Sequence, residues 1–343
     1  MTEIIKREIH RFVIGFGSEC KDLQSSSFLI TGATGLIGSV LVKCLLALDL
    51  NIEITIPVRD AKKAIKIFGE SNQYLKIEEI QSSLEEWCHN FEKGCQYIVH
   101  CASPTNGEYM KEYPVETSLM IVNSTKNLLE YAQSAQSKSM VFVSSIECYG
   151  QILKAMDKVA EEVQGYVPLF SPRSSYPMGK RFAEHLCYSS AIEYGVPVKV
   201  VRPTQTFGIG VAKDDSRVFA QFARSVINSQ DIVLHTTGDS AKPYCDTIDC
   251  ITAILYVLLK GKDGEVYNVA NPSTYISVKE MAFLVRDTFN PSINVRIEEK
   301  STKSYAPITK VPLSVDKLLS LGWRPQCGLK EMFEKLIDCI QDN

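Results

Sequence analysis

Short apolar runs alternate with longer segments in which apolar side chains recur at helical spacing. Residues 27–31 form one such run, and residues 40–48 then repeat apolar side chains every three or four positions. This pair predicts a buried strand followed by a helix. The alternation continues to about residue 201 and predicts an α/β fold with a Rossmann-type, doubly wound parallel sheet. The further strands are expected at 53–58, around 76–78, at 97–101 and at 140–143.

Beyond residue 202 the pattern becomes irregular, which indicates a second, smaller C-terminal α/β domain. The apolar residues before the first strand, between Ile4 and Val13, are spaced as on one amphipathic helix. The expected organisation is a helical extension at 1–26, a dinucleotide-binding domain at 27–202 to which 240–271 returns, and a substrate-binding domain at 203–239 and 272–343.

Composition excludes several classes of function. The 343 residues are 45% hydrophobic with a formal net charge of −3, and no basic stretch points to nucleic acid. No apolar run reaches the ~18 residues of a membrane span, and the basic residues near the start precede no apolar signal core. The eleven cysteines lack C-x-x-C spacing, and no histidines have metal-site spacing. We therefore expect a cytoplasmic protein with reduced thiols, no metal, and no nucleic-acid or membrane partner.

The seven residues at 32–38, GATGLIG, stand between the first strand and the first helix of the sheet. In such a turn Gly32 allows the tight bend, Gly35 lets the backbone approach a pyrophosphate, and Gly38 lets helix and strand pack closely. The helix N-terminus then offers free N–H groups to the phosphates. The residues expected to bind the cofactor here are Gly32, Thr34, Gly35, Leu36, Ile37 and Gly38.

The cofactor's ribose should meet the residue after the second strand, about 20 residues beyond the glycines. Arg59 stands there, followed by Asp60, with Lys62 and Lys63 close behind. An arginine suits a 2′-phosphate, so the sequence favours NADP. The alternative is that Arg59 stacks on the adenine while Asp60 binds the ribose of NAD.

A tyrosine and a lysine provide candidate acid–base chemistry. Tyr176 and Lys180 are spaced i, i+4, so on a helix they share one face. A nearby ammonium favours the tyrosinate, which can take a proton from an alcohol as its hydride leaves. Such pairs are common on helix surfaces, but this one follows by about 30 residues a strand that ends in Ser144 and Ser145. That position favours a catalytic pair, with serine as a hydrogen-bond donor to the substrate oxygen.

With these motifs the chain resembles the extended short-chain dehydrogenase/reductase family, the NAD-dependent epimerases and dehydratases that act on sugar nucleotides. The resemblance covers roughly residues 27 to 340. It is carried by GATGLIG at 32–38, VHCAS at 99–103, SSIECYG at 144–150, YPMGK at 176–180, VVRPTQTFG at 200–208, YNVANP at 267–272 and KLLSLGWRP at 317–325.

The resemblance implies roles for individual residues. Ser145 matches the catalytic Ser/Thr, Tyr176 the base and Lys180 its partner. The further residues implied at the cofactor are Glu79, Ile80, Cys101, Ala102, Ser103 and Pro203. The implied substrate is a nucleoside diphosphate sugar. Gln205 stands where the family usually has Asn, and Lys242 where it often has an arginine on the diphosphate; Arg217 is a second diphosphate candidate.

The reaction depends on the turn that follows Ser145. Ile146 cannot donate a proton, which disfavours 4,6-dehydration. Glu147 matches a glutamate of dehydratases and of UDP-glucuronate decarboxylases; it is either catalytic or a structural carboxylate. A decarboxylase also needs a basic residue that holds the carboxylate of the sugar. Arg173 and Lys154 are candidates, although neither lies in a recognisable motif.

We therefore expect an epimerase that works through a keto-sugar intermediate. The alternatives are a UDP-glucuronate decarboxylase or dehydratase-like enzyme, an NADPH-dependent sugar-nucleotide reductase, and a non-catalytic Rossmann protein that senses the cofactor.

A homodimer is also expected, because relatives commonly pair through the two helices predicted at 114–134 and 176–194. Apolar residues give each helix a stripe, part of which must face its own sheet. They are Leu119, Val122, Leu128, Leu129, Phe182, Leu186 and Ile192.

Overall fold

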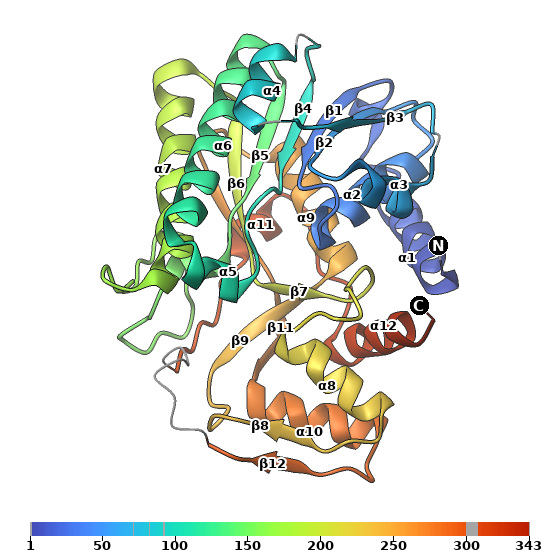
Figure 1. Cartoon of the computed structure of the whole chain (residues 1–343), viewed down its shortest axis with the longest axis vertical. Coiled ribbons are helices and arrows are strands. Elements are labelled where there is room, and N and C mark those ends of the chain that lie inside the picture. The colour runs from blue at the N-terminus through green and yellow to red at the C-terminus, as the bar shows by residue number, and fades with distance from the viewer. Residues whose placement is uncertain (1, 71, 82, 92, 300–307, 343) are drawn as a thin grey trace.

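The computed structural model describes residues 2–70, 72–81, 83–91, 93–299 and 308–342. A seven-stranded sheet forms the upper part of the molecule in Figure 1, with strand order β10-β6-β5-β4-β1-β2-β3. Every neighbouring pair in it is parallel, as the alternation of strands and helices predicts. Its strands are β1 (Ser27–Thr31), β2 (Glu53–Val58), β3 (Leu75–Glu79), β4 (Tyr97–His100), β5 (Ser139–Val143), β6 (Val198–Pro203) and β10 (Val266–Val269).

Both faces of this sheet are buried, which explains why its strands are apolar at almost every position. In β1, Phe28 and Ile30 pack into one core while Leu29 packs into the other. Successive side chains of a strand point to opposite faces, so a strand covered on both sides needs apolar residues at odd and even positions alike.

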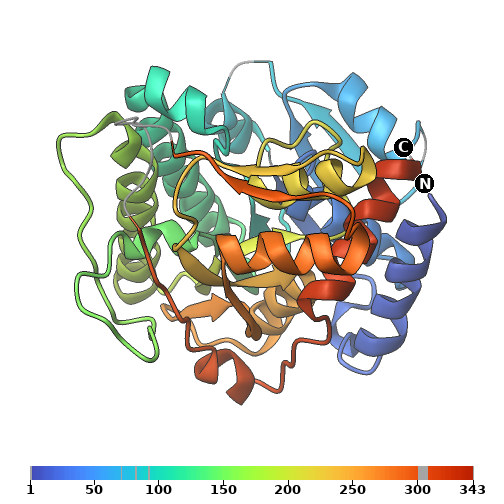
Figure 2. The same ribbon diagram turned by 90° about the horizontal axis from the view of Figure 1, so that it is seen from below.

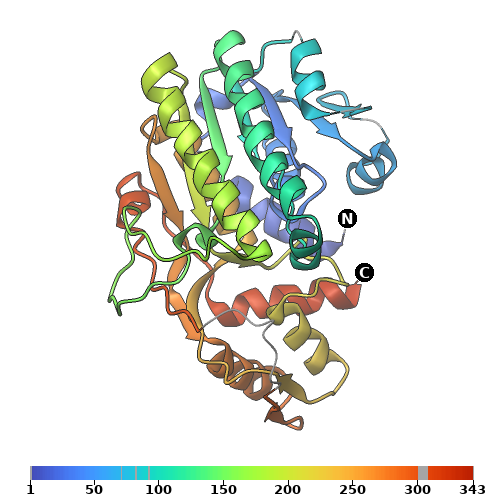
Figure 3. The same ribbon diagram turned by 60° about the vertical axis from the view of Figure 1, so that its left-hand side comes forward.

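Helices form the two outer layers (Figures 1 and 3). One face is covered by α1 (Glu3–Phe16), α2 (Leu36–Ala47), α3 (Ala61–Phe68) and α9 (Thr247–Lys260). The other is covered by α4 (Leu84–Asn90), α6 (Pro114–Ser134) and α7 (Ser175–Tyr194). Short elements complete this part: α5 (Gly107–Glu112), α11 (Asp316–Ser320) and the 3₁₀ turns η1 (Lys21–Leu23), η2 (Ile146–Tyr149) and η3 (Pro172–Ser174).

The smaller part has a separate apolar core. A three-stranded sheet has the order β11-β9-β7, and β8 pairs with β12. The strands are β7 (Gln205–Phe207), β8 (Ile232–Leu234), β9 (Ala241–Asp246), β11 (Asn271–Ser277) and β12 (Val295–Ile297). The helices are α8 (Val218–Ile227), α10 (Val278–Phe289) and α12 (Leu329–Asp342). Seen from below, α10 lies across the front of this part (Figure 2).

The chain passes between the two sheets directly after β6, β9 and β10. Residues 241–246, which the sequence assigned to the returning segment of the first domain, instead form β9 of the smaller sheet, because they pair with β7 and β11. The chain returns to the larger part at Thr247. Leu318 and Trp323 also pack into the larger core, although the sequence placed them with the substrate domain.

The order of strands reverses between β1 and β4, the place where open α/β sheets bind ligands at the carboxyl ends of their strands. Because β6 leads straight into β7, that edge faces the smaller part. Any ligand held there would lie between the two parts. No helix within the described ranges is long and apolar enough to cross a membrane.

Candidate active site

The turn after β1 is packed so tightly that two of its positions require glycine. Gly32 has a φ of +67°, and a Cβ there would lie 2.6 Å from the amide nitrogen of Ala102. A Cβ on Gly38 would lie 2.4 Å from the carbonyl oxygen of Gly32. The turn is thereby held against the residues after β4, and α2 is drawn close to the turn. The resulting cradle is formed by backbone.

The N-terminus of α2 is open to an anion. Its N-cap is Gly35, which has no side chain to accept the first amides. In α3, α4, α5, α9 and α10, by contrast, an N-cap side chain accepts from the first turn. The uncapped first-turn N–H groups belong to Leu36, Ile37 and Gly38, and Thr34 lies in the same turn. These donors and the helix dipole fit the diphosphate of a dinucleotide.

The residues after β2 and β3 form the adenosine end of this edge. Asp60 caps α3, because its Oδ1 accepts from the amide of Lys63 at 2.9 Å. Glu79 Oε1 accepts from the amide of Ala61 at 3.0 Å, and Ile80 follows directly on β3. Arg59 is exposed and has no hydrogen bond or ion pair to any described residue. Asp60 is thus partly engaged, while the guanidinium of Arg59 is available to a phosphate.

The floor of the cradle comes from the neighbouring strand ends. Cys101, Ala102 and Ser103 follow β4, and the buried Pro203 ends β6. His100, at the end of β4, is fully buried between Thr31 and Ser124, and burial lowers its pKa to about 3. It is a packed residue, as the sequence indicates. The described residues contain no group of His, Cys, Asp and Glu side chains placed to hold a metal ion.

The first turns of α7 bury the predicted acid–base pair at the end of β5. Tyr176 is 7% exposed and Lys180 only 1%. Lys180 Nζ donates to the carbonyl oxygen of Val143 at 2.8 Å, and burial lowers the pKa of Lys180 to about 8. Tyr176 lies beside Ser145, whose hydrogen bond lowers the pKa of the phenol. The three residues predicted to act together are therefore adjacent.

One expectation about Tyr176 is wrong for this structure. The sequence suggested that the Lys180 ammonium lowers the pKa of the tyrosine. Burial and the charge of Glu147 instead raise the pKa of Tyr176 above its ordinary value of 10. The ammonium is directed at the carbonyl of Val143 and lies 5.8 Å from the centre of the tyrosine ring, so it does not offset these effects.

Glu147 lies at the same strand end and is paired. The Oγ of Ser145 accepts from the amide of Glu147 at 3.2 Å, which begins η2. The Glu147 carboxylate accepts from Arg173 Nη2 at 2.6 Å, and the guanidinium lies 5.8 Å from the ring centre of Tyr176. The other terminal nitrogen, Nη1, is buried without a partner among the described residues. Lys154, the second candidate named from the sequence, is exposed on the loop.

Two residues of the smaller part complete the site from the opposite side. Gln205 in β7 pairs with Tyr244 in β9, and Lys242 lies two residues before Tyr244, so the three side chains share one sheet face. Burial lowers the pKa of Lys242 below its ordinary value, and the nearby carboxylate of Glu147 offsets part of that shift. Within the described chain, Gln205 Oε1 and the Tyr244 hydroxyl are buried without hydrogen-bond partners. Tyr244 packs in the core of the smaller part against Phe207, so Gln205 Oε1 and Arg173 Nη1 are the unpartnered groups assigned to the site.

Arg217, the other diphosphate candidate, is held by its neighbour. Its Nε and Nη2 donate to the carboxylate of Asp215 at 3.0 and 2.5 Å. A substrate phosphate at Arg217 would therefore compete with Asp215.

A buried network behind the strand end was not named from the sequence as part of the site. Glu184 accepts from Ser144 Oγ at 2.5 Å and from Arg202 Nη2 at 2.6 Å. Arg202 also lies 4.8 Å from the ring centre of Tyr149. This network fixes both ends of the turn that carries Glu147. The signal was available, because Glu184 is a charged residue one turn after Lys180 on the buried face of α7.

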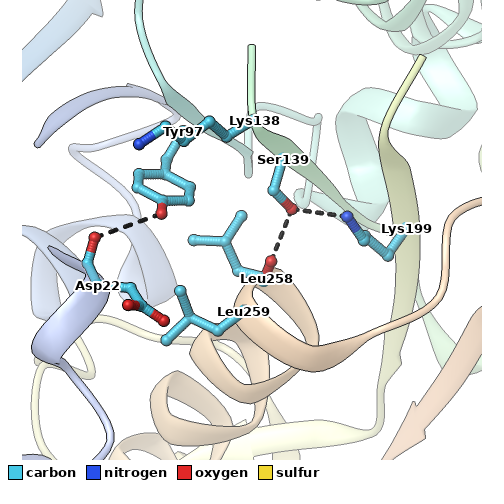
Figure 4. Close-up of a pocket in the computed structure, with 7 residues that line it drawn as sticks. All are labelled: Asp22, Tyr97, Lys138, Ser139, Lys199, Leu258 and Leu259. Carbon is cyan, nitrogen blue, oxygen red and sulfur yellow. Dashed lines mark hydrogen bonds between the residues drawn. The ribbon is translucent and has the colours of Figure 1, made fainter. Parts of the chain in front are cut away.

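A cavity of about 350 Å³ lies elsewhere, at the amino ends of β4, β5 and β6 (Figure 4). Two of its polar side chains already have partners: Lys199 donates to Ser139 Oγ at 2.9 Å and pairs with Asp263 at 2.5 Å. It lies at the opposite edge of the sheet from Tyr176, so we assign the chemistry to the cradle.

Comparisons with known proteins agree with this geometry. Residues 28–270 match the sequence profile of the NAD dependent epimerase/dehydratase family. The chain is 27% identical over 307 residues to UDP-glucuronic acid decarboxylase 5 of Arabidopsis thaliana, which covers 88% of this chain and 86% of that protein.

Two solved structures have the same fold. The UDP-glucose 4-epimerase of Thermotoga maritima, solved with UDP-glucose, has a TM-score of 0.79 at 20% identity and covers 92% of this chain and 98% of that one. The UDP-glucuronic acid 4-epimerase of Bacillus cereus, solved with UDP-glucuronic acid and NAD, has a TM-score of 0.76 at 19% identity and covers 92% and 99%.

Proposed function

The chain belongs to the NAD dependent epimerase/dehydratase family, a family of nucleotide-sugar-modifying enzymes, and on this premise we propose that it decarboxylates a nucleoside diphosphate uronic acid through a 4-keto intermediate. The observation that carries the proposal is the ion pair of Arg173 and Glu147 beside Tyr176. Arg173 offers an unpartnered buried nitrogen to a sugar carboxylate, and Lys242 adds a second cation from the smaller part.

This proposal reverses the order that the sequence alone favoured. Epimerase ranked first because no basic residue lay in a recognisable motif near Glu147. In the fold, Arg173 reaches Glu147 across 26 positions of the chain. The Arg173 side chain is partly exposed, but its buried Nη1 is free to bind a carboxylate by a strong charge-assisted hydrogen bond. The name of the plant relative points the same way.

The residues of the site divide the work of the reaction. Tyr176, with Ser145 as a hydrogen-bond partner of the substrate oxygen, takes the proton of the 4-hydroxyl. A bound oxidised nicotinamide would supply the acceptor for the C4 hydride, and its positive charge would favour the tyrosinate. The ketone at C4 makes the sugar a β-keto acid, so the C5–C6 bond breaks, carbon dioxide leaves, and the electron pair enters an enolate.

Arg173 holds the carboxylate until carbon dioxide leaves. Glu147 then supplies the proton that must be added at C5. Return of the hydride to C4 and of the proton from Tyr176 gives the shortened sugar. The net reaction consumes no reductant, because the oxidation and the reduction occur on the same molecule.

A mass-spectrometric screen of UDP-, dTDP-, CDP- and GDP-sugars, with uronic acids included, tests the reaction directly. Loss of the mass of carbon dioxide supports decarboxylation. An unchanged mass with a new retention time would mean epimerisation, and a change of two hydrogens would mean net redox chemistry. Either result would overturn the proposal.

Variants at Arg173 and Glu147 test the assignment of roles. Because a hydrogen bond to a charged group contributes about 1.5–3 kcal/mol, Arg173→Gln should lower kcat/KM for the uronic acid by ~10–100-fold. Lys154→Gln, on the same loop but exposed, is the matched control and should have no effect. Glu147→Gln should stop decarboxylation while hydride transfer continues. Full activity of Glu147→Gln would make that carboxylate structural.

Epimerisation at C4 is the second candidate. The observation that favours it is that Glu147 is already held by Arg173, as a structural carboxylate would be. The structural relative from Bacillus cereus is named as an epimerase of UDP-glucuronic acid. The two candidates share the substrate class and differ in whether carbon dioxide leaves.

For the cofactor we propose NADP over NAD. The supporting observation is that Arg59 is exposed and unengaged, whereas Asp60 already caps α3. Denaturing the purified protein and assaying the supernatant for nucleotide tests this choice. Stoichiometric NAD would reject it, and an empty site with micromolar affinity for NADPH would instead favour a net reductase.

We also propose a homodimer formed through α6 and α7. These helices pack on one another and leave large apolar side chains exposed. Leu128 and Leu129, which the sequence included in the stripe, face the chain's own core. The exposed members are Val115, Leu119, Phe182, Tyr188 and Ile192. A monomer mass by light scattering at micromolar concentration would reject the dimer.

A further inference from the structure

The first and last helices of the chain meet beside the boundary between the two parts. The N-terminal helix α1 packs on α2 and α9 of the larger part, and α12 packs on α8 of the smaller part. The two helices also contact each other, and the two ends of the chain lie side by side in Figures 1 to 3. Helix α1 is therefore placed to connect the larger part to the smaller one.

Charged side chains join the two helices. At the surface, Arg11 Nη1 of α1 lies 2.6 Å from Glu331 Oε1 of α12. In the interior, Lys335 Nζ of α12 lies 2.7 Å from Glu8 Oε2 of α1. Lys335 is 1% exposed and Glu8 3%, so this second pair is shielded from solvent.

The buried lysine also contacts the point where the chain crosses between the parts. Lys335 Nζ lies 3.4 Å from Asp246 Oδ2, and Asp246 is 1% exposed. Asp246 is the last residue of β9 and the N-cap of α9, where its Oδ1 accepts from the amide of Ile248 at 3.0 Å. One ammonium thus links three segments that are far apart in sequence: α1, α12 and the junction of β9 with α9.

The buried charges of this cluster balance one another. Two buried carboxylates share one buried ammonium, and the N-terminus of α9 further stabilises the charge of Asp246. Burial alone would lower the pKa of Lys335, but the carboxylates of Asp246 and Glu8 raise it above its ordinary value. Glu8 also lies 3.2 Å from Arg7 and 3.7 Å from Arg11, whereas Asp246 has no other cation within ion-pair distance in the described chain, so removal of the lysine would leave Asp246 as an uncompensated buried charge.

We propose that α1 is an intramolecular clasp, in which Glu8 acts through Lys335 and Asp246 to hold the smaller part against the cofactor cradle. Glu8, Lys335 and Asp246 are positioning residues, since none of them touches the site. Their effect reaches it along β9, which carries Lys242 four residues before Asp246 and pairs with β7, which carries Gln205. The clasp is independent of which sugar is bound and goes beyond the proposed reaction.

The test is the isosteric variant Glu8→Gln, which removes the charge of the carboxylate and keeps its shape. Glu3→Gln is the matched control, because Glu3 lies on the same helix but is exposed and, among the described residues, pairs only with Lys6. Hydrogen–deuterium exchange without ligand is the first measurement. We expect Glu8→Gln to increase exchange in β7, β9 and the first turn of α9 by several-fold, with β1, β4 and β5 unchanged.

Kinetics with the sugar nucleotide identified by the screen is the second measurement. Glu8→Gln should raise KM for the sugar by ~3–10-fold while the Kd for NADPH stays within twofold, whereas Glu3→Gln should change neither. The proposal is overturned if exchange rises equally throughout the large sheet, or if KM and the cofactor Kd rise together. Either result would mean that the cluster only stabilises the fold.

Further variants keep the idea testable if no substrate is found. The pair Arg11→Gln and Glu331→Gln, made singly and together, weakens the exposed half of the bridge without burying an unpaired charge. Exchange in β9 should rise in each single variant, and the double variant should add little to them. Additive increases, or none, would contradict the clasp.

Discussion

The cofactor cradle and the substrate side of the site are built by different means. The cradle is formed by backbone: a turn in which Gly32 and Gly38 leave no room for a Cβ, and a helix whose first amides meet no capping side chain. The substrate side is formed by side chains from η2, η3, β7 and β9, and two of its buried polar groups, Arg173 Nη1 and Gln205 Oε1, lack partners in the described chain. The cofactor cradle therefore forms without help from distant side chains, whereas the substrate side keeps buried polar groups that a ligand could satisfy.

Tyr176→Phe has the largest expected effect and tests the point where the two halves meet. Loss of a positioned acid–base group lowers turnover by ~10²–10⁴-fold. The affinity for NADPH should not change, because the cradle does not depend on the phenol. Tyr194→Phe, an exposed tyrosine at the end of the same helix, is the control and should leave both unaltered. Near-normal turnover in the Tyr176 variant would remove the tyrosine from the mechanism.

Gly38→Ala tests whether the cradle depends on backbone alone. The added Cβ would lie 2.4 Å from the carbonyl oxygen of Gly32, so α2 must move away from the turn. Overpacking of this kind costs about 1–3 kcal/mol, and cofactor affinity should fall with stability. Thermal unfolding and a fluorescence titration with NADPH measure the two effects.

The matched change is Gly15→Ala in α1, where a Cβ would meet nothing within 4 Å. There alanine should add about 0.5–1 kcal/mol of stability, since glycine weakens a helix. Equal behaviour of the two variants would contradict the role given to the turn.

Arg59→Ala examines the one part of the cofactor half that depends on a side chain. Removing the guanidinium should weaken NADPH binding by about 1–2 kcal/mol, because the residue is exposed and its charge is partly screened. The affinity for NADH should stay the same. Lys66→Ala, an exposed lysine on the helix α3 that follows, is the control. A similar loss for both nucleotides would show that Arg59 contacts the adenine instead.

Asp249→Asn concerns the boundary between the halves, and its expected effect depends on pH. Burial, with Asp246 close by, raises the pKa of Asp249 to about 7 from the ordinary value of 3.8. The folded state therefore keeps this proton to higher pH than the unfolded state does, and the associated stability is lost as pH rises from about 4 to 7. The amide carries no charge and can still accept from the amides of Gln326 and Cys327, as the carboxylate does.

The variant should consequently be more stable than the parent by on the order of 4 kcal/mol at pH 8 and equal to it near pH 4. Chemical denaturation across this range measures the difference, with the exposed Asp214→Asn as control. A constant difference at all pH values would mean that Asp249 does not titrate in this window.

The sequence by itself determined the large sheet and the cradle, because both are encoded locally. Strands buried on two faces need continuous apolar runs, and helices need apolar side chains every three or four residues. Gly32 and Gly38 are required by contacts within a single strand–turn–helix unit and with the next strand end. Tyr176 and Lys180 share a face because both lie within two turns of one helix.

The tertiary structure alone decided which distant side chains meet. Arg173 follows Glu147 by 26 positions, and no local rule places its guanidinium on that carboxylate. Helix α1 was predicted, but its link to Lys335, 327 residues after Glu8, was not. Likewise, β9 joins the smaller sheet because β7 and β11 offer it partners, not because of its own composition. Local spacing fixes backbone shape, whereas the contacts that choose a substrate depend on how the parts pack, and that packing places the charges around Tyr176.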